Sequence, residues 1–326
     1  MQLLERSSTA ARATLASGAP VFVPVNPIEY HGPHLPLRTD GLVAAGLIRD
    51  LHAALAARRQ GWPLLVVPDL EAGCDPVPGP GSRPVSYPRL RELVEGTCAA
   101  LASLGARRVV LMTFHGSPLH NLALEAGVQL LRRRGVRAVA PFHLVLRRLI
   151  DGAGQSVAAE ALAEVTDPEE RASIARDLGR DIHAGFLETS LALHYAPASV
   201  HPRYVDLPPC PAVTPAAPLA AAARAARALG RRELAGELDF AAHGLGWYAL
   251  RPFPAYTGRP HRATARAGAA LAARIVAEGM PMVLEVLDGR AAPPPPVMTW
   301  AASLSLGGRV GLPQVPLSDV ASGVLE

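Results

Sequence analysis

The chain has 326 residues, 49% of them hydrophobic, and a formal net charge of +4, with arginine as its only strongly basic side chain because the sequence contains no lysine. The missing lysine excludes a P-loop lysine, a Schiff-base lysine and a serine–lysine dyad, and the low aromatic content of 5% argues against a nucleic-acid partner. No apolar run free of charge and proline reaches the roughly 18 residues of a membrane span, and residues 1–19 lack the apolar core of a secretory signal, so we expect a cytoplasmic protein without a membrane partner.

The first half of the chain predicts alternating strands and helices. β-Branched and apolar residues at 21–25 predict a buried strand, and apolar residues at helical spacing over 42–55 predict a helix that begins near Thr39 or Asp40. The alternation continues with strand 62–68, a Pro/Gly-rich loop at 73–88, helix 89–104, strand 108–113, helix 119–134 and strand 136–142. This pattern predicts an α/β fold with a mostly parallel sheet covered by helices on both faces.

The second half of the chain predicts mainly helices and loops. The expected elements are helical residues at 158–178 with a break at Asp167, a Pro-rich loop at 197–218, a helix at 219–234, a helix at 261–279 and an extended arm after residue 287. We expect one domain over residues 1–287 and a C-terminal extension over residues 288–326.

The loop after the first strand contains a dense set of possible metal ligands. Glu29, His31, His34 and Asp40 lie close together in it, and His115 follows a different strand. Oxygen and nitrogen ligands suit zinc, manganese or iron(II), and a set without thiolate indicates a catalytic metal. The carboxyl ends of parallel strands share one edge, so the sheet can bring His115 beside the loop. The alternatives are a solvated turn for the loop and a capped loop position for His115.

Asp181, His183 and Glu188 form a second cluster, in a segment too polar for a core. His183 is a candidate general acid beside a metal, because imidazole can hold a proton near neutral pH. The alternative is structural, with Asp181 capping a helix and Glu188 at the surface. We expect most of the remaining histidines to lie at the surface or in satisfied loop positions: His52, His120, His143, His194, His201, His243 and His261.

Four segments together carry a family resemblance. They read Glu-x-His-Gly-x-His-Leu-Pro-x-x-Thr-Asp at 29–40, strand plus His-Gly at 113–116, Asp-x-His-Ala-Gly-x-x-Glu-Thr-Ser at 181–190, and Tyr-x-Gly-x-Pro-x-x-Ala at 256–263. The first and third are long and specific. From about residue 21 to about residue 287, the chain resembles the creatininase (creatinine amidohydrolase) family.

The resemblance implies a three-layer α/β/α fold with two divalent metal ions of zinc, manganese or iron. It implies that Glu29 and His115 hold one ion, His31 holds the other, and Asp40 bridges them. It also implies cleavage of a C–N bond in a small amide, a formamide, a cyclic ureide or, in one branch, a peptide of the mycofactocin pathway. Members are commonly homo-oligomers and often hexamers, so we expect a homo-oligomer.

Two departures from the family pattern refine these expectations. Creatininase has a metal-binding glutamate two residues after the later histidine, where this chain has Ser117, so the second ion would need Glu188 as a ligand. The family's substrate loop is also altered at 74–86, which suggests a substrate other than creatinine. We expect a hydrolase that uses a metal-activated hydroxide, with His183 and Glu188 as catalytic residues. The alternatives are a peptidase or amidase of natural-product biosynthesis and a catalytically silent binding or scaffold subunit.

Overall fold

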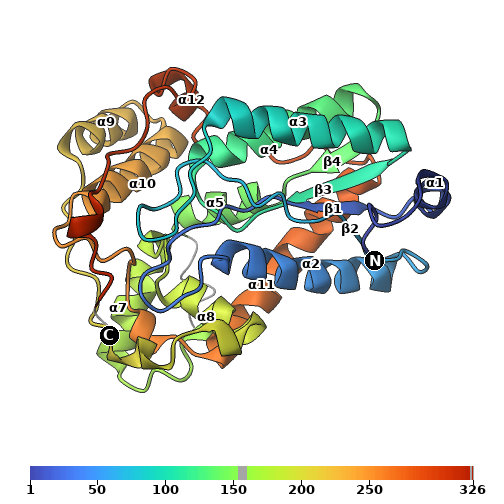
Figure 1. Ribbon diagram of the computed structural model, residues 1–326. Coiled ribbons are helices and arrows are strands. Elements are labelled where there is room, and N and C mark those ends of the chain that lie inside the picture. Colours follow the sequence, from blue (N-terminus) through green and yellow to red (C-terminus); the bar gives the residue numbers. More distant parts are fainter. Residues whose placement is uncertain (153–159, 324, 326) are drawn as a thin grey trace.

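The computed structural model describes residues 1–152, 160–323 and 325, and a parallel sheet lies at its centre between two layers of helices (Figure 1). The four strands have the order β2–β1–β3–β4, with bounds β1 Val21–Pro24, β2 Leu65–Val66, β3 Arg108–Met112 and β4 Arg137–Val139. The α-helices are α1 Ser8–Leu15, α2 Thr39–Arg58, α3 Tyr87–Leu104, α4 Pro118–Arg133, α5 Phe142–Ile150, α7 Pro168–Asp177, α8 Phe186–Tyr195, α9 Ala217–Ala228, α10 Arg232–Tyr248, α11 Ala265–Leu287 and α12 Trp300–Leu304. Short 3₁₀ helices are η1 Leu178–Arg180, η2 Pro197–Ser199, η3 Pro202–Asp206, η4 Pro260–Arg262 and η5 Leu317–Asp319.

The strands are apolar on both faces because helices cover both faces. Val21 and Val23 of β1 belong to the core under α3 and α4, whereas Phe22 between them belongs to the core under α2, α8 and α11. Successive side chains of a strand point to opposite faces, so a continuous apolar run buries both sides of the sheet. The predicted three-layer α/β/α class with a parallel sheet is confirmed.

The register of the central strands determines where the polar loops meet. Pro24 at the end of β1 pairs with Met112 at the end of β3. The loops that follow these two strands therefore start side by side at the carboxyl edge of the sheet. That edge is where ligands bind in open parallel sheets.

Two predicted strands are shorter in the structure than the sequence suggests. The strand expected at 62–68 is only Leu65–Val66, and its outer edge pairs with the N-terminal residues, since Leu3 N donates to Val66 O (2.9 Å) and Val66 N donates to Met1 O (3.0 Å). The strand expected at 136–142 stops at Val139, and α5 begins shortly after Pro141. Apolar composition alone did not separate this strand end from the helix start.

The prediction of a single helix at 219–234 is wrong. The chain forms a helical hairpin in which α9 ends at Ala228, Gly230 takes a left-handed conformation (φ +73°), and α10 runs from Arg232 to Tyr248. The two helices pack against each other (Figure 1). Glycine makes this reversal without steric cost. The hairpin places α10, which the sequence did not predict, beside the site described below.

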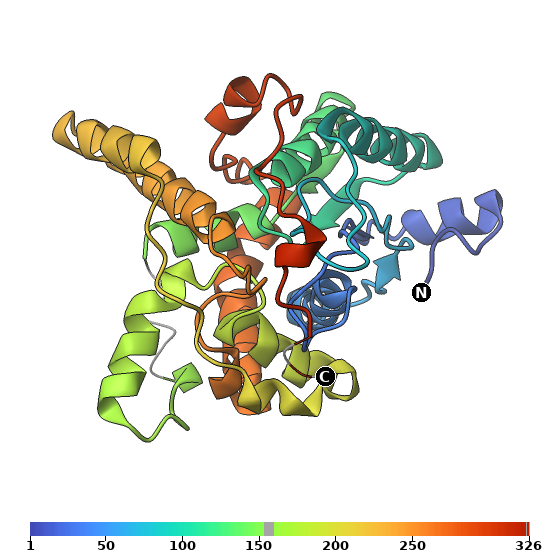
Figure 2. The same ribbon diagram turned by 60° about the vertical axis from the view of Figure 1, so that its left-hand side comes forward.

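The C-terminal part also differs from its prediction. The helix expected at 261–279 is α11, which begins at Ala265 and continues through Pro281 to Leu287. The arm expected to be extended contains the short helix α12 and packs against the body of the protein, as Figure 2 shows. In the helical prediction at 158–178, α7 follows the break at Asp167, and residues 158 and 159 lie outside the described residues.

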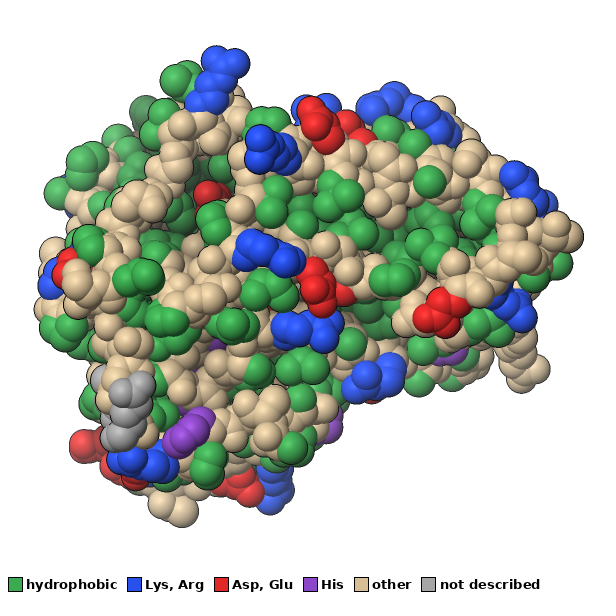
Figure 3. Space-filling view, viewed as in Figure 1, with side chains coloured by type: hydrophobic (Ala, Val, Ile, Leu, Met, Phe, Trp, Pro, Cys, Tyr) green, Lys and Arg blue, Asp and Glu red, His purple; other side chains and the backbone are tan. Residues whose placement is uncertain are grey.

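The exposed surface mixes charges of both signs. On the face shown in Figure 3, arginine side chains are interspersed with acidic ones. Ion pairs of this kind include Arg38–Glu71 (3.1 Å) and Arg203–Asp206 (3.1 Å). Among the helices described, none combines the length and hydropathy needed to cross a bilayer.

Candidate metal centre

Six side chains singled out in the sequence meet at the carboxyl edge of the sheet. They come from the loop after β1 (Glu29 and His31), the first turn of α2 (Asp40), the loop after β3 (His115), and the segment that leads into α8 together with its first turn (His183 and Glu188). All six are buried, with exposed fractions between 0% and 7%. Segments far apart in sequence thus place three carboxylates and three imidazoles within one small volume.

The distances divide this cluster into two halves that share Asp40. In one half, His115 Nδ1 lies 2.9 Å from Glu29 Oε2 and 3.6 Å from Asp40 Oδ2. In the other half, His31 Nε2 lies 3.4 Å from Asp40 Oδ1 and 3.9 Å from Glu188 Oε2. Asp40 presents a different oxygen to each half, which is the geometry of a bridging carboxylate.

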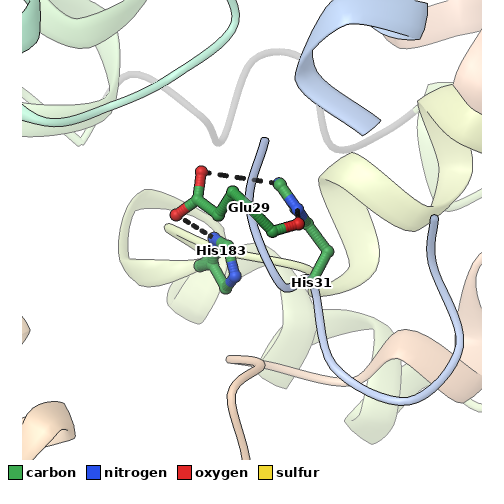
Figure 4. A group of neighbouring side chains, drawn as sticks. All are labelled: Glu29, His31 and His183. Atoms are coloured by element: carbon green, nitrogen blue, oxygen red, sulfur yellow. Dashed lines mark hydrogen bonds and ion pairs between the residues drawn. The ribbon is translucent and has the colours of Figure 1, made fainter. Parts of the chain in front are cut away.

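His183 lies close to carboxylates of both halves of the cluster. His183 Nδ1 lies 3.8 Å from Glu29 Oε1 and 4.0 Å from Glu188 Oε2, and His31 Nε2 lies 4.0 Å from Glu29 Oε2. Figure 4 shows Glu29 between the two imidazoles, with one oxygen turned toward each ring. His183 therefore borders both halves of the cluster.

Backbone carbonyls orient all three imidazoles in the same way. The ring nitrogen remote from the carboxylates donates to a carbonyl in each case: His31 Nδ1 to Glu29 O (3.0 Å), His115 Nε2 to Cys74 O (2.8 Å) and His183 Nε2 to Tyr30 O (2.9 Å). A carbonyl only accepts, so these nitrogens carry hydrogen. In a neutral ring the other nitrogen then has a lone pair directed at the cluster, as a metal-binding histidine requires.

Several buried atoms of the cluster have no hydrogen-bond partner among the described residues. They include His31 Nε2 and both carboxylate oxygens of Asp40. Burying polar atoms without a partner is costly, and the cost is greatest for charged groups. A divalent cation between these atoms would satisfy them, so the residues present fit a metal ion.

The ionisable side chains of the cluster strongly shift one another's pKa values. Burial acts to raise the pKa of Glu29, but the neighbouring His115 and His31 lower it to about 2. Burial acts to lower the pKa of His31, but Asp40 and Glu29 raise it to about 10. Burial raises the pKa of Glu188 to about 8. Protonated imidazoles thus balance the charge of carboxylates such as Glu29, so a divalent ion must displace protons from these imidazoles to bind.

The segment that carries His183 is fixed by Thr257. The Thr257 hydroxyl accepts the backbone N–H groups of Ile182 and His183 (3.0 and 3.1 Å) and donates to Asp181 Oδ1 (3.2 Å). Thr257 lies within the fourth sequence segment of the family resemblance, 256–263. Thr257 therefore positions His183 through its backbone and is not itself one of the six residues of the cluster.

Sequence reasoning missed Asn26, a buried residue that ties the strand ends together. Asn26 Oδ1 accepts from Phe114 N (3.1 Å), and Asn26 Nδ2 donates to Asp69 Oδ2 (2.8 Å). These bonds connect the loops after β1, β2 and β3. Its position directly after a buried strand was the available signal.

The Ser117 side chain makes local hydrogen bonds at the start of α4. Its side chain caps the start of α4 and donates to Asp75 Oδ2 (3.0 Å), a carboxylate that the sequence analysis did not single out. Burial raises the pKa of Asp75. The position where creatininase has a glutamate thus supplies a hydroxyl whose proton is already engaged.

Three histidines lie away from their expected places. His34, the second imidazole of the first loop, is not among the six residues of the cluster. It connects the loop to α8 instead, because its Nε2 bonds to Thr189 Oγ1 (2.9 Å). His120 and His143, expected among surface or loop positions, are buried with exposed fractions of 0% and 1%. His120 Nε2 lies 3.1 Å from the carbonyl oxygen of Val25, the residue directly after β1.

Comparison with known proteins identifies a family and a relative that match most of the chain. The sequence model of a family described as "Creatininase: Creatinine amidohydrolase" matches residues 5–282. A protein of Mycobacterium ulcerans (strain Agy99), named mycofactocin precursor peptide peptidase, is 28% identical over 205 residues, which cover 61% of this chain and 67% of that protein.

Solved structures of similar fold include creatininases in different metal forms. A mutant creatininase described as the Zn–Zn type has a TM-score of 0.54 at 20% identity, covering 90% of this chain and 100% of that one. A structure described as creatininase Mn has a TM-score of 0.52 at 20% identity, covering 88% and 98%. A putative creatinine amidohydrolase from Bacteroides fragilis NCTC 9343 has a TM-score of 0.51 at 20% identity, covering 82% and 90%.

Proposed function

This chain belongs to the creatininase family, and from that premise we propose that it is a metal-dependent hydrolase that cleaves a C–N bond. The observation that carries the proposal is the shared carboxylate of Asp40, which faces His115 through one oxygen and His31 through the other. The unpaired buried atoms and the carbonyl-bonded imidazoles support a pair of divalent ions at this place.

Each ion has its own set of ligands in this proposal. Glu29 and His115 would hold the first ion, His31 and Glu188 would hold the second, and Asp40 would contribute one oxygen to each. Glu188 takes the place left by Ser117, because its Oε2 lies 3.9 Å from His31 Nε2. A divalent ion here would lower the pKa of a bound water from about 15.7 toward about 7 and would polarise the substrate carbonyl. Zinc, manganese and iron(II) all accept such ligands.

His183 moves the proton in this scheme. Its Nε2 hydrogen is engaged by the Tyr30 carbonyl, so the exchangeable position is Nδ1, which faces Glu29. Burial lowers the pKa of His183 well below its usual value, with the charge of His31 adding to the effect. The ring therefore starts neutral, takes a proton from the attacking water at Nδ1 and delivers it to the departing nitrogen. His183, which the sequence suggests as a general acid, thus acts first as a general base.

We propose an amide or peptide substrate in place of creatinine. The name of the Mycobacterium ulcerans relative supports a peptide. The altered loop at 74–86 also supports a different substrate, because it contacts the centre directly: Val77 N donates to Glu29 Oε1 (2.6 Å) and Cys74 O accepts from His115. Three expectations stay predictions: the homo-oligomeric state, the cytoplasmic location, and the boundary between a domain at 1–287 and a C-terminal extension at 288–326.

Metal removal and restoration test the proposed function. Purified protein treated with a chelator should lose hydrolysis of every active member of a panel of linear amides, cyclic amides and peptides. Zinc, manganese or iron(II) should restore it, with metal bound in proportion to activity. Protein that purifies with well under one metal ion per chain, and that gains no turnover on metal addition, would instead identify a silent scaffold subunit.

A further inference from the structure

A cavity of about 250 Å³ lies directly beside the metal centre. His115, His183 and Glu188 form one part of its wall, so a group inside it can reach the centre without crossing the protein. The cavity extends away from these residues between α5 and α10. The cavity therefore opens directly onto the place where the proposed hydrolysis would occur.

The wall away from the centre is apolar. Typical lining residues are Val145, Leu146, Leu149, Phe240 and Ala241. We call this part the apolar side pocket. No arginine is among its lining residues, so no cation of the described chain is placed there to pair with a carboxylate or phosphate.

The two further carboxylates that line the cavity are already engaged. Asp75 accepts from the Ser117 hydroxyl (3.0 Å), and Asp181 accepts from Thr257 Oγ1 (3.2 Å) and from Leu187 N (3.2 Å). They have less capacity to bind a positively charged group than free carboxylates would. The apolar side pocket is therefore suited to an uncharged apolar group.

The C-terminal segment supplies one side of the apolar side pocket. Met298, Trp300, Ala301 and Leu312 line it, and all four lie beyond residue 282, the last position of the family match. Figure 2 shows this segment, in red, running from α12 down the front of the molecule. These residues are thus the part of the cavity wall that the family match does not include.

Specific contacts hold this segment in place. Trp300 Nε1 donates to Glu237 Oε2 of α10 (2.9 Å). Farther along the chain, Phe253 N donates to Asp319 O (2.7 Å) and Ala321 N donates to Phe253 O (2.9 Å). The wall formed by Trp300 is therefore fixed at both ends of the segment.

We propose that the apolar side pocket binds a bulky uncharged apolar group next to the scissile bond, such as an aromatic or branched aliphatic side chain, and that the C-terminal segment sets this preference. The proposal rests on the hydrolase function proposed above. Its size supports it, because an apolar cavity of about 150 Å³ already accommodates benzene. A small polar ring such as creatinine would leave most of the apolar wall uncovered.

Two neutral amides that differ in one side chain test the proposal. N-acetylphenylalanine amide and N-acetylglycine amide are compared with the metal-loaded, full-length protein, both as substrates by kcat/KM and as ligands by calorimetry. Discrimination by an apolar pocket reaches about 10- to 200-fold for a single methylene. We therefore expect the phenylalanine compound to be preferred by at least about 100-fold.

Two variants alter the pocket from opposite sides. Ala241→Phe fills it from α10, and Trp300→Ala removes the wall provided by the C-terminal segment. Each should reduce the preference by at least about tenfold. The matched controls are Ala249→Phe at the exposed end of α10 and Leu304→Ala at the exposed end of α12, which should leave the preference unchanged.

The two readouts separate the failure of this proposal from the failure of the proposed function. If neither amide is cleaved, the hydrolase assignment fails for these amides, and calorimetry still measures the preference of the pocket. Equal or absent binding of the two compounds overturns the proposal. A preference that persists in both Ala241→Phe and Trp300→Ala also overturns it, because that preference would arise elsewhere.

Discussion

Replacing Asp40 by asparagine is the sharpest perturbation of the proposed centre. The change keeps the size of the side chain and removes the charge of the carboxylate that turns one oxygen toward His31 Nε2 (3.4 Å) and the other toward His115 Nδ1 (3.6 Å). Asparagine keeps one neutral carbonyl oxygen, so it could not offer an anionic oxygen to each of two ions. The matched control is Asp50→Asn on the same helix, where the carboxylate accepts from the Tyr195 hydroxyl (2.6 Å) outside the cluster.

The magnitude of the effect follows from mass action. Changing a residue that only orients a metal ligand already weakens binding by about 10- to 100-fold, so loss of a shared ligand should weaken it by at least about 100-fold. With metal at about 1,000 times its dissociation constant, binding stabilises the wild-type fold by about 4 kcal/mol, whereas the variant would retain about 1.4 kcal/mol. For a chain of this size the difference corresponds to roughly 5 °C in Tm.

Thermal unfolding with and without zinc or manganese, together with elemental analysis, measures this difference. The wild type and Asp50→Asn should show the full metal-induced rise in Tm. Asp40→Asn should show a rise smaller by about 5 °C, a lower metal content and no turnover. If Asp40→Asn bound as much metal as the wild type and showed the same rise in Tm, Asp40 would not bridge two ions.

Three further predictions concern the groups around the ions. The pKa of His31 is about 10 in the metal-free fold against 6.5 for a free histidine, so its contribution to stability is fully present below pH 6.5 and is lost as the pH rises toward 10. Urea unfolding of chelator-treated protein between pH 6 and 10 should show this decline, and a flat profile would contradict it. His183→Gln should lower kcat by about 10²- to 10⁴-fold while metal content is kept, whereas a parallel fall in metal content would make His183 a ligand. Thr257→Val should lower the free energy of unfolding by about 1–3 kcal/mol through the unsatisfied N–H groups of Ile182 and His183. The control Thr97→Val, at a half-buried position of α3 whose hydroxyl donates only to Leu93 O, should stay within about 0.5 kcal/mol in the same denaturation assay.

Local sequence patterns were sufficient for the central layer of the fold. The strands at 21–24 and 108–112 are apolar apart from Arg108 at the first position of the second one, because helices cover both of their faces, and this signal does not depend on distant contacts. Gly105 and Gly135 lie directly after the helices predicted at 89–104 and 119–134, and both adopt the left-handed backbone that ends a helix. The family resemblance carried by the four segments was confirmed by the family match.

The sequence was less informative where one pattern permits two structures. The alanine-rich residues of α9 could continue as one helix, and the reversal at Gly230 depends on α10 packing back against α9. The apolar residues after Val139 fit a strand as well as a helix. In both places tertiary packing decides, because local preference is weak.

For the site, the sequence by itself determined which residue types are available and near which strands they lie. It identified Glu29, His31, Asp40, His115 and the His183 segment as chemically apt. Only the tertiary structure decided that Asp40 turns one oxygen to each half of the cluster, that His34 bonds to Thr189 of α8, and that the C-terminal segment closes an apolar pocket beside the cluster. The physical reason is that side-chain direction and cavity shape arise from contacts between segments distant in the chain, which residue types and spacing do not encode locally.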